Sequence, residues 1–115
     1  MRILDGEQTL TRIFIGDSDK IGGRVAHHVL IERLRKDGFA GVTVLHGVAG
    51  FGAQSVIHTA HILDLSTDLP VVIEVVDDAE HSDKLLAILD EILDGGLVTM
   101  ERVRVVRYAP RKGHR

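Results

Sequence analysis

The chain has 115 residues, of which 44% are apolar and 27% charged, which is ordinary for one globular domain with a modest core. The absence of cysteine excludes disulfides, thiolate catalysis and cysteine-bound metals, and a net charge of −3 gives no electrostatic basis for binding nucleic acid. No stretch has the apolar character of a signal peptide or a membrane span. We therefore expect a cytoplasmic protein that does not insert into membranes. Its single domain, residues 1–115, should have an ordered core from about 7 to 108 and a flexible tail at 109–115.

Apolar patterning predicts a strand, a helix and a second strand in the first half of the chain. Residues 9–15 have the composition of a strand. The turn that follows contains Asp17 and Asp19, which are suited to capping a helix. From 20 to 36, apolar residues recur in steps of four, which predicts an amphipathic helix. Residues 42–48 then read as the second strand.

The second half of the chain repeats this pattern. Residues 71–76 are the clearest strand, and Asp77 with Asp78 should cap a helix over about 79–93. A last strand runs from about 97 to 108. The order β-α-β-β-α-β is that of the ferredoxin-like sandwich. The sequence thus predicts an α+β fold in which two helices cover one face of a four-stranded antiparallel sheet.

Both faces of the predicted sheet carry apolar side chains. Ile13 and Ile15 point to one side of the first strand and Phe14 to the other, while Ile73 and Val72 alternate in the same way. One set belongs under the helices, so the other faces water in a monomer. This pattern favours an oligomer, the alternative being scattered exposed apolar residues of the ordinary kind.

A glycine-rich segment follows the second strand. Gly50 and Gly52 flank Phe51, so the backbone can turn sharply there and approach a ligand without Cβ obstruction. Gln54, two residues on, can donate and accept hydrogen bonds. We interpret this segment as the base of a loop that responds to a ligand.

Several motifs around this segment resemble those of a known superfamily. Residues 41–44 (GVTV), 50–54 (GFGAQ) and 68–76 (DLPVVIEVV) resemble segments of the PII signal-transduction proteins. The sequence is similar above all to an uncharacterised PII-like family. The shared motifs are GFG at 50–52, IHT at 57–59, LSTDLPVVIE at 65–74 and GLVT at 96–99. The resemblance extends from about residue 6 to 108.

The resemblance implies a homotrimer with ligand clefts between neighbouring subunits. In PII proteins these clefts bind adenine nucleotides, and the loop after Gly-Phe-Gly changes shape with the ligand. Gln54 matches the glutamine that helps to hold a metal-nucleotide. The loop then docks on a membrane transporter or an enzyme. We expect a regulator rather than an enzyme, with an adenine nucleotide and magnesium at Gly50, Phe51, Gly52 and Gln54 and its phosphates near Gly95 and Gly96.

The chain also departs from the PII pattern. The phosphate-binding loop of PII proteins carries a lysine, but residues 94–99 contain none. Ala53 replaces the arginine of the Gly-Phe-Gly-Arg-Gln motif, and Tyr108 is the only tyrosine, so uridylylation in the loop is not expected. Arg102 and Arg104 share one face of the last strand and are candidates for replacing the lysine. The alternative is that they form a solvated strand face.

Histidines suggest a different class of function. His58 and His61 are three residues apart, with Asp64 three further on, a spacing that can present two imidazoles and a carboxylate to a divalent metal. Adjacent His27 and His28 point in different directions on a helix. No nucleophile–base–carboxylate set is evident. Three functions therefore compete, namely a ligand-sensing regulator, a histidine-based metal-binding protein and a ligand-free trimeric scaffold.

Overall fold

Two long strands form the centre of the fold in the computed structural model, which describes residues 2–52 and 68–111. They are β1 (Gly6–Gly16) and β5 (Pro70–Asp77), and they pair antiparallel with Ile13 opposite Ile73. The other elements of the described chain are β2 (Lys20–Ile21), β3 (Arg24–Val25), α1 (Ala26–Lys36), β4 (Thr43–His46), α2 (Ala79–Ile92) and β6 (Leu97–Val105).

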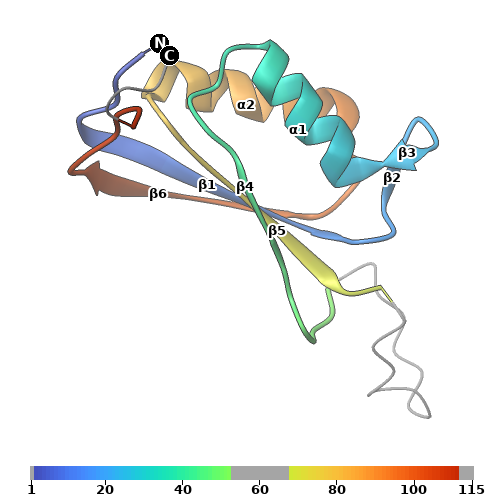
Figure 1. The fold of residues 1–115 in the computed structure, drawn as a ribbon. Helices are drawn as coiled ribbons and strands as arrows, with labels where there is room; N and C mark the ends of the chain where they lie inside the picture. Colours follow the sequence, from blue (N-terminus) through green and yellow to red (C-terminus); the bar gives the residue numbers. More distant parts are fainter. Residues whose placement is uncertain (1, 53–67, 112–115) are drawn as a thin grey trace.

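The main sheet has the strand order β4-β5-β1-β6 and is antiparallel throughout. Both helices lie over the same face of this sheet (Figure 1). The predicted ferredoxin-like α+β fold is therefore confirmed. Neither described helix is long and apolar enough to cross a membrane.

The core lies between the sheet and the two helices. Ile13, Ile73 and Val75 point from the central strands towards the helices and are almost fully buried, as their alternation in the sequence predicts. Leu30 of α1 and Leu85 of α2 meet them and have no exposed surface. Burying a leucine side chain contributes about 1.5–3 kcal/mol, so this layer supplies much of the stability.

The predicted first helix is wrong over residues 20–25. These residues form a two-stranded hairpin of β2 and β3, with Lys20 opposite Val25. Gly22 and Gly23 make its turn at φ angles of +57° and +81°, which a helix cannot accommodate. The helix begins only at Ala26.

The expected capping of α1 by aspartates is also wrong. Val25 occupies the N-cap and makes no side-chain hydrogen bond to the helix. The carboxylate of Asp19 instead accepts a hydrogen bond from the backbone N–H of Gly16 at 3.0 Å. At α2 the prediction is confirmed, because the Asp78 side chain accepts from the backbone N–H of His81 at 2.8 Å.

Candidate functional site

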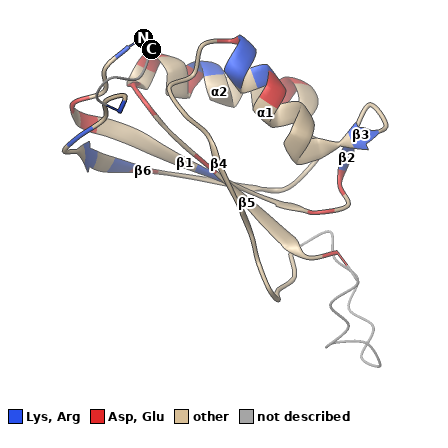
Figure 2. Ribbon diagram, viewed as in Figure 1, with Lys and Arg blue, Asp and Glu red and all other residues tan. Residues whose placement is uncertain are grey.

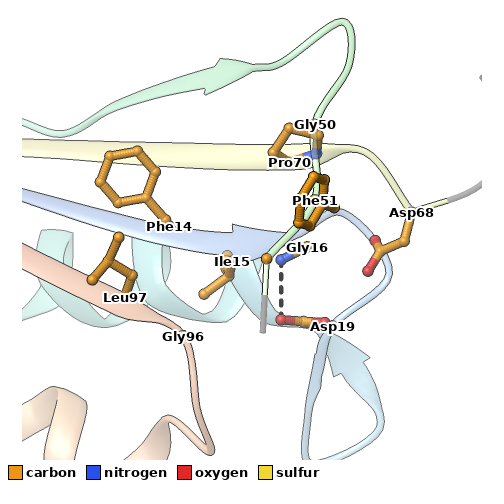
Figure 3. A pocket seen from close by; sticks show the side chains of 11 residues that line it. Phe14, Ile15, Gly16, Asp19, Gly50, Phe51, Asp68, Pro70, Gly96 and Leu97 are labelled. Atoms are coloured by element: carbon orange, nitrogen blue, oxygen red, sulfur yellow. Dashed lines mark hydrogen bonds between the residues drawn. The ribbon is translucent and has the colours of Figure 1, made fainter. Parts of the chain in front are cut away.

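A pocket of about 400 Å³ lies at the end of the sheet where β1 stops and β5 and β6 begin. Figure 3 shows its lining side chains. Phe14 of β1 and Leu97 of β6 form one apolar wall, and they are direct neighbours across the strand pair. Phe51 and Pro70 lie across the pocket from them. The Phe51 side chain is 72% exposed, so its ring is available to cover a ligand.

Two glycines allow the backbone to form part of the pocket wall. Gly96 has a φ of +100°, and a Cβ there would lie 3.0 Å from the carbonyl oxygen of Phe14. Gly50 has a φ of +147°, and a Cβ there would lie 3.2 Å from Cγ of Pro70. Both positions thus need glycine for conformation as well as space. The turn before β6 and the segment after β4 can therefore come close to Phe14 and Pro70 at the pocket wall.

Two carboxylates lie at one side of the pocket (Figure 3). Asp19 accepts the Gly16 hydrogen bond described above, and Asp68 accepts from the backbone N–H of Ser18 at 2.7 Å. These bonds hold the turn that follows β1. Their negative charges disfavour a bare anion beside them and favour a ligand that carries a cation or presents a neutral group on that side.

Four of the predicted ligand-binding residues lie together here. Gly50, Phe51, Gly52 and Gly96 all line the pocket, and Gly95 belongs to the same turn before β6. Gln54 lies outside the described residues. The metal candidates His58 and His61 also lie outside them. The same holds for residues 53–67, the loop that the sequence assigns to ligand response, and for the tail residues 112–115.

Arg102 and Arg104 lie at the other end of β6. Arg102 is opposite Thr9 in the register, whereas the pocket residue Leu97 is opposite Phe14, so the two lie five residues apart along β6. That separation is roughly 17 Å along a strand. Figure 2 shows the basic stretch of β6 near its arrowhead, away from the start of that strand. Arg102 pairs with Glu7 at 3.0 Å and its side chain is 84% exposed. Within one chain, these arginines do not reach the pocket.

Other pocket residues were not singled out from the sequence. The sequence placed Phe14 on the opposite face of its strand from Ile13 and Ile15 without saying which face is open, and it placed Leu97 only in a strand and a motif. Their proximity depends on β1 pairing with β6, which strand alternation alone does not specify. Asp68 and Pro70 are part of the DLP motif, and that motif is the signal that could have identified them.

Comparison with known families identifies the chain. Residues 8–105 match the DUF190 family model, described as "Uncharacterized ACR, COG1993". The chain belongs to the DUF190 family. A UPF0166 protein of Aquifex aeolicus (strain VF5) is 33% identical over 108 residues, which cover 92% of this chain and 98% of the relative. UPF0166 protein MJ1524 of Methanocaldococcus jannaschii is 30% identical over 99 residues, covering 85% and 91%.

Solved structures relate this DUF190 fold to PII-like proteins. CPII from Thiomonas intermedia K12, bound to ADP and bicarbonate, superposes with a TM-score of 0.63 at 17% identity, covering 92% of this chain and 93% of CPII. CPII bound to ADP, AMP and acetate gives a TM-score of 0.60 at 19% identity, covering 93% and 94%. The fold expected from the resemblance is thus confirmed.

Proposed function

We propose that this DUF190 protein is a PII-like regulator that binds a small anionic metabolite, an adenine nucleotide with magnesium, in the pocket beside Gly50 and Phe51. The observation that carries the proposal is the pocket itself. It combines glycine backbone with exposed apolar side chains at the place where the sequence resembles the PII ligand motif. The CPII neighbours, whose structures contain ADP, support the choice of nucleotide.

The pocket is suited to a planar base. Its volume of about 400 Å³ lies within the range of small-molecule sites. Phe51, Phe14 and Leu97 offer apolar surface against which an adenine ring can stack or pack. The phosphates then extend to the turn of Gly95 and Gly96, whose backbone can approach them closely. Magnesium offsets the repulsion between the phosphates and the two pocket carboxylates.

The regulator is a homotrimer in which a neighbouring copy covers the open face of the sheet. Leu45 and Leu97 are 48% and 57% exposed, and Phe14 lies between their strands on the same face. Adjacent apolar side chains of this kind mark an interaction surface. Arg102 and Arg104 lie far from the pocket of their own chain. In such an assembly they can therefore contact only a nucleotide bound in the pocket of a neighbouring copy.

The function is regulatory rather than catalytic. The ligand alters the loop that starts at Ala53, and the loop controls a membrane transporter or an enzyme. This step rests on the PII resemblance of residues 41–76, because the loop lies outside the described residues.

Isothermal titration calorimetry with ADP and ATP, each with Mg²⁺, tests the proposal. Phe51→Ala should weaken nucleotide affinity about tenfold, because base–aromatic stacking contributes roughly 1–3 kcal/mol. Gln54→Ala should also weaken it while leaving the oligomer intact. Val48→Ala is a matched control, since Val48 is 83% exposed and does not line the pocket. If the wild-type protein binds neither nucleotide at millimolar concentration, the proposal fails and the ligand-free scaffold becomes the better account.

A further inference from the structure

Three side chains with metal-binding atoms converge at the end of the sheet beside α1. Asp17 follows β1, His27 lies in the first turn of α1 and His46 ends β4. One ligand atom of each residue lies within 4.8 Å of the other two. The ligand atoms of a tetrahedral zinc site lie roughly 3.3 Å apart, given bonds of 2.0–2.1 Å. Small side-chain rotations therefore suffice to bring these three onto one ion.

His27 supplies the observation that distinguishes this cluster from a chance grouping. It is only 6% exposed, and its Nδ1 has no hydrogen-bond partner among the described residues. A buried polar atom without a partner costs about 1–3 kcal/mol, so it needs an explanation. Its ring centroid lies 5.5 Å from that of His46.

The backbone holds the three residues in place. The N–H of Asp17 donates to the carbonyl of Leu69 at 2.8 Å, which fixes the end of β1 against the start of β5. His46 lies opposite Val71 in the β4–β5 pair. β4 and β1 therefore flank β5 on its two edges, and β5 holds both in place. Nε2 of His46 already lies 2.9 Å from Oδ1 of Asp17. His27 and His46 thus lie on a helix and a paired strand, which preorganise ligands better than loops do, and the backbone bond of Asp17 ties the turn that carries the third ligand to the residue before β5.

We propose that Asp17, His27 and His46 bind a divalent transition-metal ion of the zinc class. Two imidazoles and one carboxylate suit Zn²⁺, whereas Mg²⁺ and Ca²⁺ prefer oxygen ligands alone. The side chains of Asp17 and His46 are 49% and 54% exposed, so the ion can enter from solvent and keep a water molecule as its fourth ligand. The proposal does not depend on nucleotide binding.

A second acidic and histidine cluster does not qualify, although its atoms meet the same distance criterion. Asp77, Asp78 and His81 also group together. However, Asp77 is held by the Arg2 guanidinium at 2.7 Å, and Asp78 caps α2. Its carboxylates thus already have partners and a structural role.

Zn²⁺ titration by calorimetry, with metal content measured after dialysis, tests the site. The wild-type protein should bind Zn²⁺ at the cluster, and excess Mg²⁺ should not compete. His46→Ala and Asp17→Asn should each weaken Zn²⁺ binding at least tenfold, because even changes in the outer shell of a metal site have that effect. Both residues are half exposed, so both variants should fold. Wild-type affinity in these two variants, or no Zn²⁺ binding by the wild type, would overturn the proposal.

Two controls separate this site from the other histidines. His28→Ala removes an exposed neighbour of His27 and should leave the affinity for Zn²⁺ unchanged. A His58→Ala/His61→Ala double variant should likewise retain the ion. If the double variant loses Zn²⁺ while His46→Ala retains it, the metal belongs to the segment at 58–61 and the site proposed here does not exist.

Discussion

At the scale of single residues, the buried carboxylate of Asp77 ties distant parts of the chain together. Its side chain has no exposed surface and accepts hydrogen bonds from Arg2 at 2.7 and 3.0 Å. The backbone N–H groups of Ala40 and Asp78 donate to it at 2.9 and 2.8 Å. Tyr108 donates in turn to the carbonyl of Ala40. The acid therefore joins Arg2 to the segment of Ala40, to which Tyr108 is also hydrogen-bonded.

Replacing this acid should be costly. Asp77→Ala leaves two backbone N–H groups without their acceptor and removes one partner of the Arg2 guanidinium, which keeps Asp78 and the Gly38 carbonyl, so we expect a loss of about 3 kcal/mol in the free energy of unfolding. Urea denaturation at pH 7 measures this loss. Asp83→Ala, which removes an exposed acid in α2, is the control and should change stability by less than about 0.5 kcal/mol. Equal effects of the two substitutions would contradict this account of Asp77.

From the environment of Asp77 we also expect the stability of the protein to depend on pH. Burial alone would raise the pKa of Asp77, but the hydrogen bonds from Arg2 and the two N–H groups outweigh it and hold the pKa below its ordinary value. A depressed carboxyl pKa contributes stability above the unfolded-state pKa of about 3.9, and this contribution is lost as pH falls through the folded-state pKa. Between about pH 5 and 2, wild-type stability should therefore fall more steeply than that of Asp77→Ala. Parallel curves would contradict the assignment.

At the scale of elements, the sequence predicted the strands and helices but not the hairpin of β2 and β3. Apolar steps of four fit a helix over 20–36, and they remain compatible with a hairpin that packs Ile21 against the core. The adjacent glycines Gly22 and Gly23 were the opposing signal, because positive φ angles at both positions break a helix. The apolar periodicity takes no account of these glycines, so it cannot distinguish a helix from a hairpin over residues 20–25.

The turn between α2 and β6 gives a prediction at this scale. Gly96→Ala places a Cβ 3.0 Å from the Phe14 carbonyl oxygen in a backbone with φ of +100°. We expect a loss of about 1–3 kcal/mol, because both the conformation and the contact are unfavourable. Gly41→Ala is the matched control, since a Cβ there meets nothing within 4 Å and its φ is not positive. Thermal unfolding of the two variants measures the difference, and similar midpoints would contradict the requirement for glycine.

At the scale of the whole molecule, the candidate site was only partly predictable. Gly50, Phe51 and Gly96 could be identified because each belongs to a local motif. The cluster of Asp17, His27 and His46 could not be, because it depends on β4 and β1 lying on either side of β5. Local motifs therefore indicated the glycines and the phenylalanine of the candidate pocket, whereas they missed the proposed metal cluster, whose residues come from distant elements.

The proposed homotrimer predicts the mass of the protein in solution. Sedimentation equilibrium should give about three chain masses for the wild-type protein, in line with the homotrimer proposed above. Leu97→Glu places a charge on the exposed apolar face and should lower the mass towards one chain. Leu86→Glu, at a position in α2 that is 39% exposed, should leave the trimer intact. A wild-type mass of one chain at all concentrations would remove the basis for sites shared between copies.

The most direct test of the proposed function is a crystal structure of the protein grown with ADP and Mg²⁺. The account predicts the nucleotide in the pocket of Phe14, Phe51 and Leu97, with its phosphates beside Gly95 and Gly96 and a second copy of the chain closing the site. ADP bound elsewhere, or this pocket filled by the protein's own residues at saturating nucleotide, would contradict it.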